Sequence, residues 1–231
     1  QSLYLEINGE KKYISREIKR ISGNEDKNKN QISINIDQPG KKRKKEEWIR
    51  WQRSWQSNDT KKRSSTMFCL PFENGKCKPF LENTQIYNFY PTDEPSDIKG
   101  FLHISFNLTR DRKRLEMWGE QKAWGNENCD PEDLKLISQI NALVGEDVVG
   151  DQLVSPETII GCFLALNDFD KIKDTKGKPE KQIKKTLINT IKEKSFIPRF
   201  GGGKTSINDL TLWEHNLLEC LIENKKIQEF N

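Results

Sequence analysis

The sequence predicts an α+β protein, with a β-rich lobe built on an antiparallel or mixed sheet over residues 1–120 and a mainly helical lobe over residues 121–231. Two observations support this fold class. Up to Trp118, apolar and polar residues alternate with the period of a strand. After Asp130, helix-start signals and helical spacing of apolar residues replace that alternation. Strands followed by helices are typical of the α+β class.

The N-terminal strands follow from regular alternation. In Ser2–Ile7 leucine and isoleucine alternate with other residues, and Asn8-Gly9 supplies a tight turn before the alternation resumes over Lys11–Ile18. We therefore expect a hairpin. Asn24–Asn30 contains no apolar residue and is expected to be a loop, and Gln31–Ile36 is the next expected strand.

The segment Lys41–Arg63 is strongly basic, with ten lysines and arginines against three acids. Its tryptophans have the spacing i, i+3 and i+7, which predicts an amphipathic helix with the indoles on its buried face, and we prefer this interpretation. The second interpretation is a surface for single-stranded nucleic acid, because bases stack on indoles and phosphates pair with cations. The residues that would form this surface are Lys44, Trp48, Arg50, Trp51, Arg53 and Trp55.

The following strands lead to a basic turn. A second hairpin from Thr66–Pro71 to Phe80 precedes two expected strands, Gln85–Tyr90 and Gly100–Leu108. The loop between these two strands, Pro91–Lys99, contains two prolines and three acids and is expected to lie outside the sheet ladder. The apolar residues of the last strand should form its buried face, and they are Leu102, Ile104, Phe106 and Leu108.

This last strand ends in Thr109–Arg114, where four cations occupy five consecutive positions. Cations that are held at the end of a buried strand are presented rigidly, and this geometry suits an anion, above all a phosphate. The alternative interpretation is a solvated turn, since charge clusters at strand ends commonly face water.

The C-terminal half carries repeated helix-start signals. Asp130-Pro131 and Ser155-Pro156 each combine an N-cap residue with a proline at the first helical position. Pro179 opens a third expected helix, Phe196–Phe200 is a short expected strand, and Asp209–Leu221 is a fourth expected helix.

The sequence GGGKTS at Gly201–Ser206 has the local composition of a phosphate-binding P-loop. That motif needs a glycine where this chain has Pro198, which has no amide proton to donate to a phosphate. We therefore interpret this segment as a glycine turn.

Composition limits the remaining possibilities. The chain has no run of 18 apolar residues and no signal-peptide pattern at its start, and its net charge of +4 does not by itself argue for nucleic acid. Five scattered cysteines without a CxxC pair, together with two histidines, indicate neither zinc nor a disulfide framework and favour a reducing cytoplasm. We expect no metal ligands and no membrane partner, and we expect the chain to be a piece of a longer protein.

One part of the chain resembles a known family. The sacsin-like branch of the GHKL ATPases (gyrase, heat-shock chaperones, histidine kinases and MutL) carries an F-x-P-T element, a glycine, and then F-x-L-T-x-x-R. The matching residues here are Phe89–Thr92, Gly100 and Phe106–Arg112. Leu70-Pro71, an upstream tryptophan (Trp48 or Trp51) and Ser195–Gly202 also resemble that family. The similarity is close over residues 86–115 and loose over residues 1–120.

The resemblance implies the region that follows the nucleotide pocket: the end of the ATPase sheet and then a middle, transducer-like lobe. By motif position Arg112 would contact the ATP γ-phosphate, with Arg110 as its neighbour and Thr109 and Arg114 as further nucleotide contacts. Lys113 stands where the family often has a glutamate that orients the arginine. ATP and Mg²⁺ would be held only by the missing nucleotide-binding region, so no cofactor is expected on this chain alone.

Three functional hypotheses follow. The leading one is the middle portion of a chaperone-like ATPase in a microbial defence or restriction system. Its expected partners are the rest of the same polypeptide, a client protein or a nucleic acid, and a second copy of the chain. The second is a nucleic-acid-binding module, and the third is an interaction scaffold without activity.

Overall fold

The computed structural model describes residues 2–7, 10–56, 63–82, 84–111, 113–116, 131–163, 179–199 and 202–209. Its strands are β1 (Ser2–Ile7), β2 (Glu10–Gly23), β3 (Lys27–Asp37), β4 (Lys44–Gln56), β5 (Arg63–Glu73), β6 (Lys76–Cys77), β7 (Gln85–Asn88), β8 (Tyr90–Pro95), β9 (Phe101–Ile104), β10 (Asn107–Leu108), β11 (Leu115–Glu116), β12 (Ile197–Pro198) and β13 (Lys204–Thr205). Its helices are α1 (Pro131–Ala142), the π-helix η1 (Leu143–Val148), α2 (Pro156–Phe163) and α3 (Pro179–Glu193).

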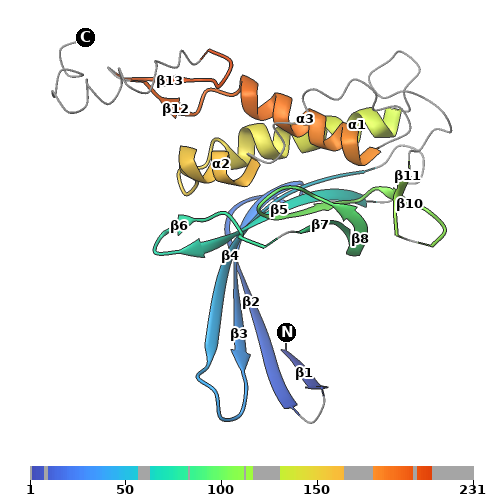
Figure 1. Cartoon of the computed structure of the whole chain (residues 1–231), viewed down its shortest axis with the longest axis vertical. Helices are drawn as coiled ribbons and strands as arrows, with labels where there is room; N and C mark the ends of the chain where they lie inside the picture. Colours follow the sequence, from blue (N-terminus) through green and yellow to red (C-terminus); the bar gives the residue numbers. More distant parts are fainter. Residues whose placement is uncertain are drawn as a thin grey trace.

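One large mixed sheet organises the molecule (Figure 1). Its strand order is β1-β2-β3-β4-β5-β9-β7-β8, with β6 paired to β5. The first five strands form an antiparallel meander, and β7 runs parallel to β9. Strands β10 and β11 form a separate two-stranded hairpin beyond the end of β9.

The helices lie on one face of the upper part of this sheet (Figure 1). The core between the two layers contains Trp51, Phe68 and Leu102 from the sheet and Phe163 from α2, each at most 2% exposed. The rings of Phe68 and Phe163 stack with centroids 5.7 Å apart. Burying large apolar side chains of this kind contributes about 1.5–3 kcal/mol each. The arrangement confirms the predicted α+β class.

Several predicted elements are confirmed. The first hairpin forms with the register Ser2↔Ser15 to Ile7↔Glu10. Helices α1 and α2 begin at the predicted prolines, Pro131 and Pro156. Three residues of the expected face of the last strand are buried, and they are Leu102, Ile104 and Phe106.

The predicted helix within Lys41–Arg63 was wrong, because residues 44–56 form strand β4. Spacing of i, i+3 and i+7 also places Trp51 and Trp55 on one face of a strand and Trp48 on the other. Trp51 and Trp55 are buried, and Trp48 packs against Phe80 and Phe101. The sheet supplies β4 with hydrogen-bonding partners on both sides, β3 and β5. Tertiary pairing of this kind overrides a local helical pattern.

Two loop boundaries also differ from the prediction. Strand β3 already begins at Lys27, within the expected loop. Strand β8 pairs with β7, although its Pro91 and Pro95 were expected to exclude it from the ladder. Prolines are tolerated there because β8 is an edge strand with one side unpaired. The expected strand Gly100–Leu108 is divided into β9 and β10.

Beyond the helical layer the sheet continues as an arm (Figure 1). We define the arm as residues 2–7, 10–18 and 32–48, since Ile18, Ile32 and Trp48 face one another in the register where it begins. The β3–β4 turn lies at its far end (Figure 1). At a rise of about 3.3 Å per residue, the six arm residues of β3 span roughly 20 Å.

The expected helix Asp209–Leu221 falls almost wholly outside the described residues, as do Cys129 and Cys220. Among the helices that the structure describes, none combines the length and the apolar character needed to cross a membrane.

Candidate functional site

The turn between β10 and β11 is closed by hydrogen bonds. The Thr109 backbone N–H donates to the Arg114 carbonyl at 3.0 Å, and the Thr109 hydroxyl donates to Asp111 Oδ1 at 2.6 Å. The backbone N–H groups of Lys113 and Arg114 donate to Asp111 Oδ1 and to the Thr109 hydroxyl, both at 3.1 Å. The short side chains of Thr109 and Asp111 therefore fold the turn back on itself, as threonine and aspartate commonly do.

These hydrogen bonds also fix the charge of Asp111. The Thr109 hydroxyl, followed by the Lys113 amide, holds the pKa of the Asp111 carboxyl below its ordinary value. The carboxylate therefore accepts hydrogen bonds from within the turn, whereas the side chains of Arg110, Lys113 and Arg114 are exposed. The three cations make no ion pair with any side chain that the structure describes.

The turn is anchored to the edge of the sheet. The Asp93 backbone N–H of β8 donates to the Lys113 carbonyl at 2.7 Å. Phe89, between β7 and β8, and Tyr90, the first residue of β8, are 83% and 75% exposed, and Phe89 has a φ of +61°. A bulky residue in this left-handed region is strained.

The structure places the predicted phosphate-contacting residues as follows. Thr109, Arg110 and Arg114 lie together on the anchored turn. Arg112, the first expectation from the family resemblance, lies outside the described residues, between Asp111 and Lys113.

The residues predicted to bind nucleic acid are not brought together. Trp51 and Trp55 are 2% and 8% exposed on the face of β4 that the helices cover, so neither ring offers a free face for a base. Trp48 lies on the opposite face, with its ring centroid 5.4 Å from that of Phe80 and 5.3 Å from that of Phe101.

The three cations predicted to bind nucleic acid lie in three different environments. Lys44 is exposed on the arm and pairs with Glu46 at 2.7 Å. Arg50 is half-buried beside Cys69, and burial lowers its pKa. Arg53 reaches the helical layer, where it pairs with Glu146 and Asp147.

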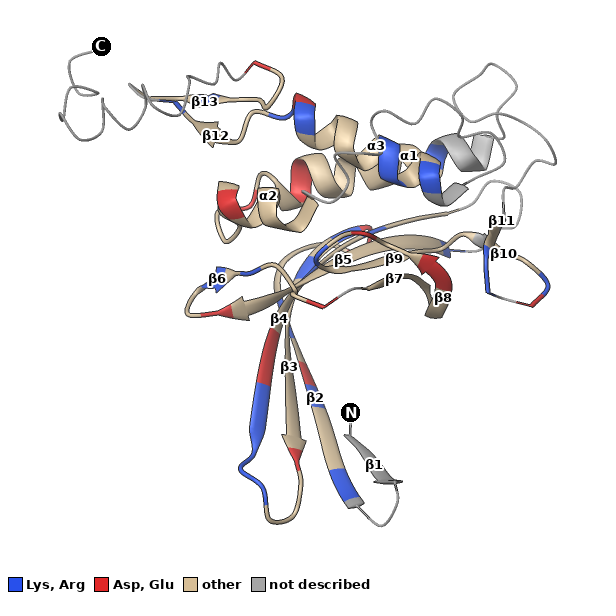
Figure 2. Ribbon diagram, viewed as in Figure 1, with Lys and Arg blue, Asp and Glu red and all other residues tan. Residues whose placement is uncertain are grey.

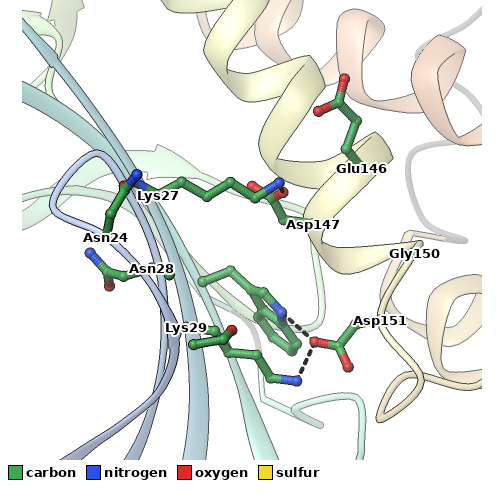
Figure 3. Close-up of a pocket in the computed structure, with 11 residues that line it drawn as sticks. Asn24, Lys27, Asn28, Lys29, Glu146, Asp147, Gly150 and Asp151 are labelled. Carbon is green, nitrogen blue, oxygen red and sulfur yellow. Dashed lines mark hydrogen bonds and ion pairs between the residues drawn. The ribbon is translucent and has the colours of Figure 1, made fainter.

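Sequence reasoning missed a charged pocket between the sheet and η1 (Figure 3). The pocket has a volume of about 410 Å³. On its helical side Asp147 and Asp151 are nearly buried, with side chains 5% and 7% exposed. The residues facing them come from β3 and β4, and Figure 3 shows Lys27 directed at Asp147 and Lys29 at Asp151.

Asp147 and Asp151 each accept hydrogen bonds from at least two side chains of the sheet. Asp151 Oδ2 accepts from Lys29 Nζ at 2.5 Å and from Trp51 Nε1 at 2.8 Å. Asp147 accepts from Lys27 Nζ at 2.6 Å and from the Arg53 guanidinium. The guanidinium is held by two acids, and Asp147 above all raises the pKa of Arg53. Because every carboxylate is already paired, this pocket joins the helical layer to the sheet and offers no vacant acid for a ligand.

Asp147 and Asp151 could not be found by a local pattern. Their partners lie about a hundred positions away in the sequence, on strands whose pairing was itself predicted only in part. Within the described ranges, no cluster of histidine, cysteine and acidic side chains could hold a metal ion. The thiols of Cys77 and Cys162 are buried, which raises the pKa of each to about 12, so both are protonated near neutral pH.

Comparison with known proteins gives no match: no family model, no curated protein and no solved structure is similar to this chain.

Proposed function

We propose that this chain is the lobe that follows the nucleotide pocket of a sacsin-like, heat-shock-chaperone-like ATPase, and that the turn Thr109–Arg114 supplies an arginine to the γ-phosphate of ATP. The observation that carries the proposal is the closed, anchored turn with its outward cations. The resemblance of Phe106–Arg112 to F-x-L-T-x-x-R assigns the leading role to Arg112, with Arg110 as its neighbour.

The chemistry follows from the geometry of the turn. Phosphoryl transfer needs little covalent help from the protein and depends on positioned cations that stabilise the charge of the transition state. A guanidinium on a turn fixed at both ends loses little further entropy when it binds a phosphate oxygen. The Asp111 carboxylate is held by Thr109 and Lys113, which leaves Arg110 and Arg114 available for an external anion.

In this proposal the chain does not hydrolyse ATP alone. ATP and Mg²⁺ are bound by a nucleotide-binding region of the same polypeptide, and the helices α1, α2 and α3 belong to the middle lobe. Docking of the turn onto the terminal phosphate distinguishes ATP from ADP and couples nucleotide state to the relative position of the two lobes. The client that responds to this movement is a protein or a nucleic acid.

The test is steady-state ATP turnover by the polypeptide that includes the nucleotide-binding region. We compare Arg112→Ala and Arg110→Ala with the wild type. Arg20→Ala serves as the control because Arg20 is exposed, like Arg110, and lies on β2, near the opposite end of the sheet from β8. Loss of a phosphate-contacting arginine should lower kcat by about 10³-fold. ATP affinity, measured separately, should change little, since the contact strengthens in the transition state.

A kcat that is unchanged in both turn variants would remove this function from the turn. A fall in only one of them would identify the phosphate-contacting residue, and an equal fall in Arg20→Ala would show that the loss reflects folding.

A further inference from the structure

The tip of the arm gathers the densest group of cations in the described chain (Figure 2). It is formed by two segments that are about thirty residues apart in sequence. Residues 11–12 lie at the start of β2, and residues 41–45 lie at the end of the β3–β4 turn and the start of β4. The pairing Tyr13↔Asp37 and Ile36↔Lys44 brings both segments to the same end of the sheet. The seven cations of this basic tip are Lys11, Lys12, Lys41, Lys42, Arg43, Lys44 and Lys45.

Five acids lie by register at the same end of the sheet and offset part of the charge of the seven cations, and they are Glu6, Glu10, Asp37, Glu46 and Glu47. Lys44 pairs with Glu46 at 2.7 Å and Lys45 with Glu47 at 2.8 Å, and both lysines are more than half exposed. Exposed pairs of this kind contribute at most about 1 kcal/mol, so a phosphate can compete for either lysine. Residues 41–43 are exposed and make no ion pair with a side chain that the structure describes.

The strands hold the basic tip at a defined place. Ten consecutive residue pairs join β3 to β4, from Lys27↔Arg53 to Ile36↔Lys44. The tip projects from the body of the molecule, on the opposite side from the helical layer (Figure 1). A long polyanion can therefore pass across the tip without meeting the helices, and several of its charges can be contacted at once.

We propose that the basic tip binds the phosphate backbone of nucleic acid, without sequence preference. Repeated, closely spaced phosphates match a cluster of lysines and an arginine, because each contact releases condensed counterions. The turn itself, residues 38–43, has no aromatic or branched aliphatic side chain. The half-exposed Tyr13 on β2 alone offers a lipid bilayer little apolar area to insert, which favours a nucleic acid over an anionic membrane. This site is separate from the buried tryptophans of β4 and does not depend on the proposed ATPase function.

The test is fluorescence anisotropy with labelled 20-nucleotide single-stranded DNA, the matching RNA and the DNA duplex, at 50, 100 and 200 mM KCl. Five phosphate contacts predict a slope of log K against log salt of about −3.5 for single strands and about −4.5 for the duplex. The variant Lys41→Gln/Lys42→Gln/Arg43→Gln should reduce the slope by roughly 2 to 3 and weaken binding about 100-fold at 50 mM salt.

The matched control is Arg110→Gln/Lys113→Gln/Arg114→Gln. It also removes three positive charges, but from the β10–β11 turn, and leaves the arm intact. It should retain most of the wild-type affinity and slope. Equal losses in the two variants would show that binding follows net charge alone, and would overturn the assignment to the arm. Absence of nucleic-acid binding at 50 mM salt, or binding only to vesicles that contain phosphatidylserine, would overturn the proposal itself.

Discussion

Replacing Asp151 by alanine should weaken the contact between the helical layer and the sheet and lower the free energy of unfolding. The Asp151 carboxylate is 7% exposed and accepts from Lys29 and from Trp51, whose side chain is buried beneath it. Its other oxygen accepts from the Leu153 backbone N–H at 2.9 Å. A single substitution therefore removes the acceptor of three donors.

The cost can be worked out donor by donor. The indole N–H of Trp51 is left without a partner in the core, which costs about 1–3 kcal/mol. The Lys29 ammonium loses its counter-ion, but its side chain is 15% exposed and can partly turn to water, so we assign about 1–2 kcal/mol rather than the full cost of a broken buried pair. With the Leu153 hydrogen bond at about 1 kcal/mol, the free energy of unfolding should fall by about 3–6 kcal/mol.

The assay is urea unfolding followed by far-ultraviolet circular dichroism, which does not depend on the fluorescence of Trp51. Asp151→Ala/Lys29→Met should recover about 1–2 kcal/mol relative to Asp151→Ala, because no unpaired ammonium remains. The control Glu46→Ala breaks an exposed pair on the arm and should cost less than about 1 kcal/mol. A loss below about 1 kcal/mol for Asp151→Ala would refute the reasoning, since the network would then not stabilise the contact between the layers.

Two further predictions concern the sheet. A Cβ on Gly100 would lie 2.6 Å from Cζ of Phe68 and 2.9 Å from Cδ2 of Leu70. Gly100→Ala should therefore lower the unfolding free energy by about 1–3 kcal/mol in the same urea assay. An unchanged midpoint would show that the core relaxes freely at this position. Burial lowers the pKa of His103 below its ordinary 6.5, so the folded state binds fewer protons than the unfolded state and stability should fall as pH drops through 6.5 to the lowered pKa. His103→Gln should reduce this loss in unfolding scans between pH 7 and pH 5, and an identical pH dependence in the variant would exclude the histidine as its source.

Local sequence patterns predicted the parts of this protein that depend on neighbours along the chain. Alternation predicted the first hairpin, and a capping residue followed by proline predicted the starts of α1 and α2. The basic turn was also predicted at its observed place, because a buried strand must end where consecutive charges begin. Its closure by Thr109 and Asp111 required the structure, since several side-chain hydrogen bonds are compatible with the same residues.

Tertiary structure decided whatever depends on distant partners. The tryptophans of β4 fit a helix locally, but pairing with β3 and β5 satisfies the backbone of the strand and buries Trp51 under the helices. Asp147 and Asp151 became part of a charged network only because η1 packs against strands roughly a hundred residues earlier. The basic tip likewise depends on the sheet, which brings residues 11–12 beside residues 41–45. Periodicity along the chain predicts which residues share a face of a helix or strand, whereas only the packing of separate elements determines what covers that face.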